Sequence, residues 1–236
     1  MFTSVDDFRD FGVRAVVTTR AAGDFALNGN ATAGSVLARW EALRSALGVA
    51  GLGSQFATAN QVHGVSVLAH DPGWTGWLRV DEGDAHFADR PGIGLGVTIA
   101  DCVPVFFAHP RQAIALAHAG WRGTASGIVR RVVPLFRSRG MDPAELRVHL
   151  GPAICGKCYE VGPDVYAQLT GTRPDGPRTV DLRAILAEQL RGEGVRHLTT
   201  SRWCTRCHND VYFSHRAGDA ERQVAAIVAE KALTAS

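Results

Sequence analysis

The chain has 236 residues, of which 46% are hydrophobic and 20% charged, the composition of an ordinary globular protein long enough to bury a full core. Its 25 basic and 23 acidic residues are interspersed and leave a formal net charge of +2, which argues against the one-sided basic surface of a nucleic-acid-binding protein. Because no apolar run reaches the length of a membrane span and the acidic amino terminus lacks a signal-peptide core, we expect a cytoplasmic protein that binds no membrane.

Predicted strands and helices follow one another along the chain. A β-branched strand at 14–20 leads into a Gly- and Asn-rich loop that is long enough to suggest a function. From Ser35, apolar residues recur at helical spacing until Gly48 ends the helix. Beyond it, the patterns predict helices at about 124–138, 181–192 and 220–233, strands at 65–70, 94–108, 113–119, 146–151 and 196–200, and an exposed loop at 171–179.

The order of these elements indicates the fold class. Long interior strands alternate with helices, but the middle of the chain holds two strands joined by a short turn, which is typical of an antiparallel hairpin. We therefore predict an α+β fold with mixed β-sheets flanked by helices, formed by residues 1–236 as one compact domain, rather than a regular βαβ array.

The expected hairpin lies in the stretch ADCVPVFFAHPRQAIALAHAGWRG, residues 100–123. It contains two apolar runs joined by a turn at His109 and Pro110. If the runs pair antiparallel, Cys102 at the start of the first lies close to His118 at the end of the second. A thiol beside an imidazole indicates either a nucleophile with its base or two ligands of a metal ion.

A third candidate, His63, stands beside Gly64 where a loop enters a strand, in the stretch ANQVHGVSVLAH. Together with Cys102 and His118 it makes a set of nitrogen and sulfur donors that suits Zn²⁺ and leaves a fourth position for water or substrate. Such a site lowers the pKa of bound water to about 7. The spacing alone equally allows Cys102 to be a buried small hydrophobic residue and His118 a hydrogen-bonded strand residue.

Two CxxC pairs form another candidate site: CGKC with Cys155 and Cys158, and CTRCH with Cys204 and Cys207. The chain has five cysteines, and this odd number fits a reducing compartment better than a disulfide framework. The pairs could hold a structural zinc ion in a closed four-cysteine knuckle, although their separation of about 45 residues exceeds the common spacing. The alternative, that some of these thiols simply pack, stays open at this point.

Two arginines are candidate anion ligands. Arg20 ends the first strand and faces the Gly- and Asn-rich loop, whereas Arg122 stands between Gly120 and Gly123 before a predicted helix start. A guanidinium with small residues at a helix amino terminus suits a phosphate or carboxylate, although the chain contains no dinucleotide-binding or P-loop motif. Several nearby acids are candidates to orient a ligand histidine or to accept a proton: Asp81, Asp84, Asp89 and Asp101.

Five segments of the chain resemble, in order, the successive signatures of one protein family: NQVHG, DAHFADRPGIGLGVTIADCVPVFF, AHAGWRG, GPAICGKCYEVG and CTRCHNDVYFSHRAGDAERQ. It is the laccase-domain, or YfiH-like, family of purine nucleoside phosphorylases, formerly described as polyphenol oxidases. The resemblance extends from about residue 18 to the carboxyl terminus. Several long motifs in the correct order are far more specific than any one of them.

The resemblance implies a mixed α/β sandwich and an active site in which His63, Cys102 and His118 hold zinc. It also implies phosphorolysis of adenosine, inosine, guanosine and methylthioadenosine to a free base and a sugar 1-phosphate, together with deamination of adenosine to inosine. The partners are then small molecules, purine nucleosides and phosphate. Arg20, at the end of the family's TTR strand, becomes the first candidate for binding phosphate, and Arg122 the second.

Two departures from the family pattern fall near this site. The loop sequence ALNGNATAG replaces the family's SLNLG, and GDAHFAD introduces His86 as an extra donor close in sequence. Three other functions remain open: a polyphenol oxidase with Cu²⁺ in place of zinc, a thiol hydrolase that uses Cys102 with His118 as base, and a non-catalytic binding module stabilised by zinc at the CxxC pairs.

Overall fold

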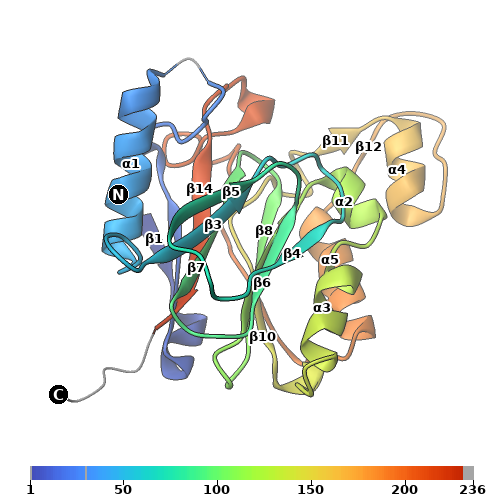
Figure 1. Cartoon of the computed structure of the whole chain (residues 1–236). Coiled ribbons are helices and arrows are strands. Elements are labelled where there is room, and N and C mark those ends of the chain that lie inside the picture. Colours follow the sequence, from blue (N-terminus) through green and yellow to red (C-terminus); the bar gives the residue numbers. More distant parts are fainter. Residues whose placement is uncertain (1, 30, 231–236) are drawn as a thin grey trace.

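The computed structural model of the chain describes residues 2–29 and 31–230, in which two six-stranded β-sheets pack against each other with helices on their outer faces (Figure 1). The first sheet has the order β1 (Phe2–Val5), β2 (Val13–Thr18), β14 (Gln223–Ala229), β7 (Ile93–Ile99), β3 (Gln55–Ala59) and β5 (Gly76–Val80). The second has the order β13 (His197–Thr200), β10 (Arg147–Leu150), β8 (Val103–Ala108), β9 (Ile114–Ala119), β6 (Ala85–Ala88) and β4 (Val67–Ala69).

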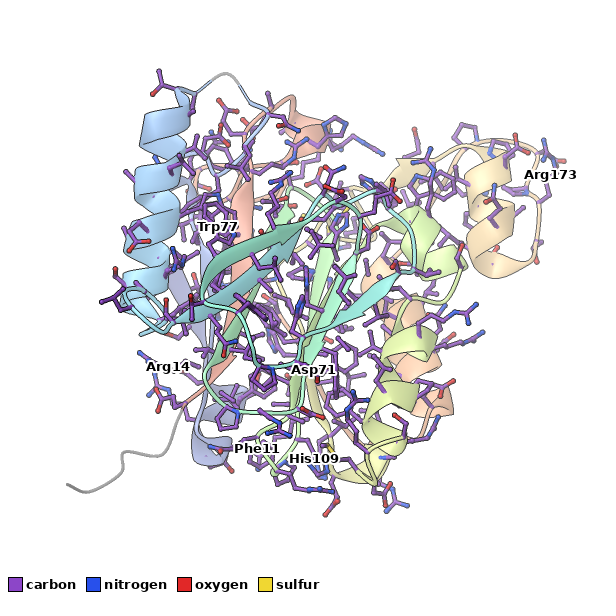
Figure 2. All side chains as sticks on the ribbon, in the orientation of Figure 1. Phe11, Arg14, Asp71, Trp77, His109 and Arg173 are labelled. Carbon is purple, nitrogen blue, oxygen red and sulfur yellow. The ribbon has the colours of Figure 1, made fainter. Side chains whose placement is uncertain are left out.

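Helices cover both outer faces of this pair of sheets. Helix α1 (Ala33–Ala46) packs on the first sheet, and α3 (Val129–Arg137) and α5 (Leu182–Gly192) pack on the second. Helix α2 (Trp121–Ala125) follows β9 directly. Helix α4 (Pro163–Thr170) projects from the body together with the ribbon of β11 (Glu160–Val161) and β12 (Arg178–Thr179), and Figure 2 shows Arg173 at the far end of this projection. Short 3₁₀ helices occupy Asp6–Phe11, Arg20–Ala22, Pro143–Glu145 and His215–Ala217.

Apolar side chains fill three layers: between α1 and the first sheet, between the sheets, and between the second sheet and its helices. Strands β8 and β9 are buried at every position because both of their faces are covered, which is why their sequences are continuous apolar runs. Both sheets mix parallel and antiparallel neighbours. The predicted α+β fold with mixed sheets and flanking helices is confirmed.

The helix predicted at 220–233 is wrong, because residues 223–229 form the central strand β14. Val224 and Val228 face α1, whereas Ala225 and Ile227 face the other sheet, so the strand is covered on both sides. A strand that is apolar on both faces has no alternation, and its sequence cannot be told from that of a buried helix. The last three residues of the predicted helix lie outside the described part of the chain.

Two further predicted segments are each broken in the middle. The strand predicted at 94–108 is two strands, β7 and β8, in different sheets, and the chain crosses between them at Asp101, whose φ is 81°. The helix predicted at 124–138 is α2 and α3, separated at Gly127 with φ 76°. A left-handed residue at each break redirects the chain, and the first break places Cys102 at the head of β8.

The remaining predicted elements are confirmed with small shifts at their ends. They are the strands β2, β4, β9, β10 and β13 and the helices α1 and α5. Strand β2 ends at Thr18, so Arg20 opens a 3₁₀ turn instead of closing the strand. The segment predicted as an exposed loop, residues 171–179, is largely exposed. Its last two residues form the exposed strand β12 of the small ribbon. Elements that the patterns did not predict are β1, β3, β5, β6, β11 and α4.

Candidate active site

His63, Cys102 and His118 come together where β8 begins and β9 ends. One nitrogen of each imidazole and the Cys102 sulfur all lie within 4.8 Å of one another. The two imidazoles meet edge to face, with ring centroids 4.8 Å apart. His63 is exposed, Cys102 half-buried and His118 buried, so the cluster, hereafter the His63 cluster, is reachable from solvent on one side. Two nitrogens and one sulfur with an accessible side fit a metal ion that has three protein ligands.

The β8–β9 hairpin sets the distance between Cys102 and His118. The strands pair antiparallel with Val103 opposite Ala119 and Pro104 opposite His118. Cys102 stands just before Val103, so this pairing places it beside the end of β9 that carries His118. The predicted hairpin, with its turn after Ala108, is confirmed.

Asp84 positions the two histidines of the cluster. Its carboxylate is fully buried and accepts a hydrogen bond from His118 Nδ1 at 2.9 Å. It also accepts backbone N–H groups from Val62, His63 and Gly64 at 3.2, 2.9 and 2.7 Å. One carboxylate thus fixes both the ring of His118 and the loop that carries His63. With Nδ1 of His118 bound to Asp84, Nε2 remains for a metal.

The backbone at the cluster departs from ordinary geometry. His63 has φ 60° and Asp101, next to Cys102, has φ 81°, both in the left-handed region that non-glycine residues rarely adopt. Gly120 is needed for a different reason: a Cβ there would lie 2.9 Å from Cδ2 of His63 and 3.0 Å from Sγ of Cys102. Strained residues that persist in a well-packed structure cluster at functional sites.

Cys102 and His118 stabilise each other's charge. Burial acts to raise the pKa of Cys102, but His118 and His63 outweigh it and lower that pKa to about 6. Burial likewise acts to lower the pKa of His118, but Cys102 and Asp84 outweigh it and raise that pKa to about 9. A thiol in this environment ionises readily, and the thiolate is the form that binds metals and acts as a nucleophile.

Asp101 ties the cluster to two distant segments. Its side chain, 8% exposed, accepts the hydroxyl of Thr205 at 2.5 Å and the backbone N–H of Arg216 at 2.7 Å. Its carbonyl oxygen accepts the N–H of Ile154 at 3.1 Å. These three bonds hold the left-handed residue in place, and they thereby position the adjoining Cys102.

Two arginines and a tyrosine stand near the cluster. The guanidinium of Arg216 lies 5.0 Å from the ring centroid of Tyr159 and donates to the carbonyl of Glu160 at 2.9 Å. Burial, and to a smaller extent Cys102, raise the pKa of Tyr159 to about 12, so its hydroxyl stays protonated. The charge of Arg122 acts to lower the pKa of Tyr159, which shows that Arg122 also lies near this tyrosine. It is exposed and stacks on Trp121 at 4.5 Å.

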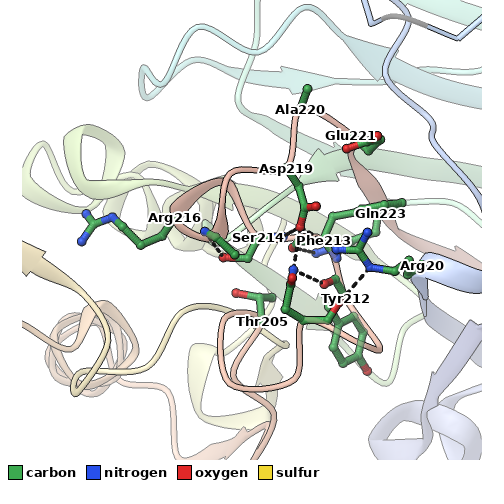
Figure 3. Close-up of polar contacts among 12 residues, drawn as sticks. Arg20, Thr205, Tyr212, Phe213, Ser214, Arg216, Asp219, Ala220, Glu221 and Gln223 are labelled. Carbon is green, nitrogen blue, oxygen red and sulfur yellow. Dashed lines mark hydrogen bonds and ion pairs between the residues drawn. The ribbon is translucent and has the colours of Figure 1, made fainter.

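Arg20 is engaged by the loop that follows Asn209 (Figure 3). Its Nε donates to the carbonyl of Asn209 at 2.8 Å, and its terminal nitrogen donates to Asp219 at 2.6 Å. The guanidinium also lies 4.4 Å from the centroid of the Phe213 ring. Figure 3 shows Arg20 near Asp219, with the side chain of Arg216, from the same loop, on the opposite side. Arg20 therefore braces the loop whose Arg216 N–H reaches Asp101.

The remaining sequence-predicted candidates separate into other contacts. His86 is fully buried and pairs with His70 at 2.9 Å, and burial lowers its pKa to about 3. Asp81 is exposed, and Asp89 forms a 2.6 Å ion pair with Arg139. The His63 cluster therefore uses Asp84 and Asp101 of the four acids that the sequence offered, and His86 is not one of its members.

The four cysteines of the CxxC pairs form a second convergence of metal-binding side chains. Their Sγ atoms all lie within 4.8 Å of one another, and no disulfide joins them. Within residues 2–29 and 31–230, this cluster and the His63 cluster are the groups of His, Cys, Asp or Glu whose geometry would hold a metal ion. The set comprises Cys155, Cys158, Cys204 and Cys207.

A cavity of about 250 Å³ opens beside the strand end that leads to His63. Gln61, two residues before His63, lines it and is locked to Thr98 by bonds to the N–H at 2.7 Å, the hydroxyl at 2.9 Å and the carbonyl at 2.8 Å. Leu27 and Asn28 line the same cavity. The loop that departs from the family sequence therefore borders it.

The sequence offered no reason to single out Tyr159, Thr205 or Arg216. All three stand inside the family segments quoted above, Tyr159 in CYEVG, Thr205 in CTRC and Arg216 in SHRAG. Position in a shared motif was thus the available signal. Their contact with Asp101 or with the neighbourhood of Cys102 depends on packing between segments far apart in sequence.

Comparison with known proteins places this chain in a family. Residues 14–230 match the family described as multi-copper polyphenol oxidoreductase laccase. A Deinococcus radiodurans protein named purine nucleoside phosphorylase is 37% identical over 194 residues, which cover 78% of this chain and 74% of that protein.

Solved structures agree on the fold. A Neisseria meningitidis protein superimposes with a TM-score of 0.85 at 27% identity, covering 98% of this chain and 99% of that one. The Bacillus licheniformis hypothetical protein YfiH also gives a TM-score of 0.85, at 24% identity, with coverage of 97% and 96%. The resemblance drawn from the sequence motifs is confirmed.

Proposed function

The chain belongs to the family described as multi-copper polyphenol oxidoreductase laccase, and from this membership we propose that it is a zinc-dependent purine nucleoside phosphorylase. Its substrates are phosphate and the nucleosides adenosine, inosine, guanosine and methylthioadenosine, and its products are a free base and a sugar 1-phosphate. The name of the Deinococcus radiodurans relative supports the reaction. The observation that carries the proposal is the His63 cluster, which has three convergent ligands and one accessible side.

Zinc suits the cluster because two imidazoles and one thiolate are ligands that it prefers, and Asp84 already fixes the tautomer of one histidine. A bound zinc ion supplies Lewis-acid polarisation and lowers the pKa of a water molecule beside it. The same chemistry supports a second activity, the deamination of adenosine to inosine, which requires a water made nucleophilic near neutral pH. We therefore include deamination in the proposal.

The protein's own residues supply positioning and charge. In phosphorolysis a phosphate oxygen attacks the anomeric carbon as the bond to the base breaks, and the base leaves with the bonding electron pair. Arginines that hold the phosphate against a cationic sugar stabilise this transition state. Tyr159, with its pKa raised to about 12, remains a hydrogen-bond donor throughout the working pH range.

Arg122 becomes the first phosphate candidate and Arg20 the second. Arg122 is exposed, stacks on Trp121, and makes no side-chain hydrogen bond or ion pair with residues 2–29 and 31–230. The guanidinium of Arg20, in contrast, is already bonded to Asn209 and Asp219. A guanidinium whose donors are unused binds phosphate without first breaking an ion pair.

The nucleoside is proposed to enter by the cavity beside Gln61. That cavity adjoins the strand end leading to His63, and its wall includes Leu27 and Asn28 from the loop that differs from the family pattern. Substrate preference is then set partly by this loop.

We further propose that residues 1–236 act as one domain in the cytoplasm, in keeping with five cysteines that form no disulfide. Across the described residues, no helix combines the length and apolarity needed to cross a membrane.

A copper-dependent polyphenol oxidase is the second candidate, favoured by the description of the family. Two histidines and one cysteine are also copper ligands. However, the described residues hold only one other metal-binding cluster, and it consists of four cysteines without a histidine. A centre of several coppers would need further histidines, so we place this function second.

The proposal is tested by following adenosine and inosine by chromatography, with and without phosphate, with zinc-loaded and copper-loaded protein. Wild type and Cys102→Ala are assayed in parallel. We expect zinc-loaded wild type to release adenine and hypoxanthine only when phosphate is present, to form inosine from adenosine, and to lose both activities on substitution. Oxygen uptake with a phenol, measured on the same samples, reports the oxidase.

Different outcomes contradict different parts of the proposal. Absence of both base and inosine with zinc-loaded wild type rules out the phosphorylase. Full activity of metal-free protein that disappears on alkylation assigns the chemistry to the Cys102 thiolate instead. Phenol-dependent oxygen uptake confined to copper-loaded protein establishes the oxidase.

A further inference from the structure

The four-cysteine cluster has the geometry of a metal site in its own right. All four Sγ atoms lie within 4.8 Å of one another, and those of Cys158 and Cys207 are 3.4 Å apart. In a tetrahedral zinc site with Zn–S bonds of about 2.3 Å, the sulfurs are about 3.8 Å apart. The cluster therefore needs only small movements of side chains to surround one ion.

Two similar turns bring the cysteines together. Each CxxC pair spans a tight turn, closed by the N–H of the residue after the pair: Tyr159 donates to the carbonyl of Cys155 at 3.0 Å and His208 to that of Cys204 at 3.0 Å. The turns are aligned by a parallel bridge between Ala153 and Cys204, at which Thr205 N–H donates to the Ala153 carbonyl at 3.2 Å. The backbone thus fixes the relative placement of two segments that are far apart in sequence.

Backbone N–H groups are directed at the first sulfur of the second pair. Cys204 Sγ accepts the N–H of Cys155 at 3.2 Å and that of Cys207 at 3.4 Å. Hydrogen bonds of this kind are strengthened when the acceptor is an anion, so they suit Cys204 as a thiolate ligand of a bound cation.

Each turn also carries a positive charge between its two cysteines. These are Lys157 in CGKC and Arg206 in CTRC, both exposed. Arg206 reaches across to the other turn and donates to the carbonyl of Cys158 at 3.3 Å. Four thiolates around Zn²⁺ carry a net charge of about −2, which two adjacent cations offset.

We propose that these four residues bind a structural Zn²⁺ ion, separate from the metal of the His63 cluster: Cys155, Cys158, Cys204 and Cys207. With four protein ligands the ion has no position for substrate, so it supplies stability and not chemistry. The proposal does not depend on the proposed function, because it concerns metal content and not turnover.

The location of this ion gives it a defined task. The turns that it clamps are the ones that hold Asp101, through Ile154 from one side and Thr205 from the other. Asp101 in turn precedes Cys102. The structural zinc would therefore stabilise the contacts to Asp101, and through Asp101 the position of Cys102 in the His63 cluster.

The test is the zinc content of reduced full-length protein, measured by elemental analysis and by native mass spectrometry. Three proteins are compared: wild type, the double variant Cys158→Ser with Cys207→Ser, and Cys102→Ser. One ion per cluster gives two per chain in wild type and one in each variant. A wild type with one zinc that disappears in Cys102→Ser overturns the proposal, as does a double variant that keeps the wild-type content.

A second measurement avoids dependence on variants that fold poorly. Co²⁺ is loaded into wild type and Cys102→Ser, and the sulfur-to-cobalt charge-transfer absorption is recorded. Because the four-cysteine cluster supplies four of the five thiolates, we expect Cys102→Ser to keep most of that absorption. Loss of nearly all of it overturns the proposal. So does an intact mass lower by about 2 Da in protein kept without reductant and then denatured, with a peptide map that assigns the disulfide to Cys158 and Cys207.

Discussion

The His63 cluster and the four-cysteine cluster are both attached to Asp101, but they differ in ligand chemistry and in closure. The first combines two imidazoles with one thiolate and has an exposed histidine. The second contains only sulfur and surrounds its centre from two turns. Three ligands with one accessible side suit catalysis, whereas four ligands suit structure. On the proposed assignment, one fold uses the same side-chain type, cysteine, for two tasks.

The backbone that holds each cluster also differs. The His63 cluster rests on residues with left-handed backbone, His63 and Asp101, and on the fully buried carboxylate of Asp84. The four-cysteine cluster rests on ordinary turns whose N–H groups already point at sulfur. Left-handed non-glycine residues lie at the cluster that we propose is open to substrate, and among the described residues none lies at the four cysteines.

The largest effect that separates the clusters is expected from His63→Asn. Asparagine tolerates the left-handed backbone of this exposed position, so we expect the free energy of unfolding to change by less than about 1 kcal/mol. Because a catalytic metal supplies several kcal/mol of transition-state stabilisation, we expect phosphorolysis to fall by about three orders of magnitude. Steady-state kinetics with inosine and urea unfolding of the same sample measure the two effects.

The double variant Cys158→Ser with Cys207→Ser provides the contrast for His63→Asn. It should lower the free energy of unfolding and leave catalysis in the surviving folded protein much closer to wild type. If His63→Asn destabilised the chain as much as the double variant does, the division of tasks between the clusters would be refuted.

The next largest effect is expected from Asp84→Asn. One oxygen of Asp84 accepts from His118 and His63 and the other from Val62 and Gly64, and the side-chain NH₂ of asparagine replaces one of these acceptors with a donor. We expect zinc affinity of the His63 cluster to fall by about tenfold to a hundredfold, the range for partners that orient a metal-bound histidine. Competition with a chromophoric chelator measures it, and Asp89→Asn at the surface pair with Arg139 is the matched control.

Equal losses of zinc affinity in Asp84→Asn and Asp89→Asn would show that negative charge near the site matters and that the orientation of His118 does not. The zinc content of the four-cysteine cluster is expected to stay at one ion in both variants. A loss there would mean that the two clusters fold as one unit.

How far the sequence could predict this site depends on the distance over which each contact acts. Cys102 and His118 belong to one hairpin, so a short turn and strand pairing were enough to bring them together. His63 comes from a different loop, and the family motif nominated it together with the other two. Asp84 could not be separated from Asp81 or its other acidic neighbours, because its role depends on a carboxylate buried among N–H groups from two elements.

The same reasoning explains the errors in the fold. Helix α1 was predicted because its buried apolar residues, Val36, Trp40 and Leu43, recur at helical spacing. Strand β14 was predicted as a helix because it is buried on both faces, so no polar residues mark its period. The strand predicted across residues 94–108 missed the crossing at Asp101, because a left-handed aspartate is stabilised there by Thr205 and Arg216 from the far end of the chain.

A smaller effect is expected from Gly120→Ala, which tests how closely the His63 cluster is packed. The new Cβ would lie 2.9 Å from Cδ2 of His63 and 3.0 Å from Sγ of Cys102, well inside ordinary contact distance. Because both side chains can give way by a few tenths of an ångström, we expect zinc affinity and activity to fall about tenfold. Gly162→Ala is the control, since nothing lies within 4 Å of its added Cβ.

Both glycine variants keep ordinary backbone angles, φ −76° at Gly120 and φ −68° at Gly162, so a difference between them reports crowding alone. Wild-type activity in Gly120→Ala would mean that the metal does not need the observed spacing of His63 and Cys102.

The smallest effect is expected from Thr205→Val, which cuts one link between the two clusters. The Thr205 hydroxyl is fully buried and donates to Asp101 at 2.5 Å, so removing it costs about 1–3 kcal/mol of stability. Activity should fall by less than about tenfold, because Asp101 keeps the N–H of Arg216. The control is Thr124→Val, whose hydroxyl is equally buried but lacks a partner among the described residues. A loss of stability in Thr124→Val as large as in Thr205→Val would assign the effect to repacking, and the link through Asp101 would then carry no energy of its own.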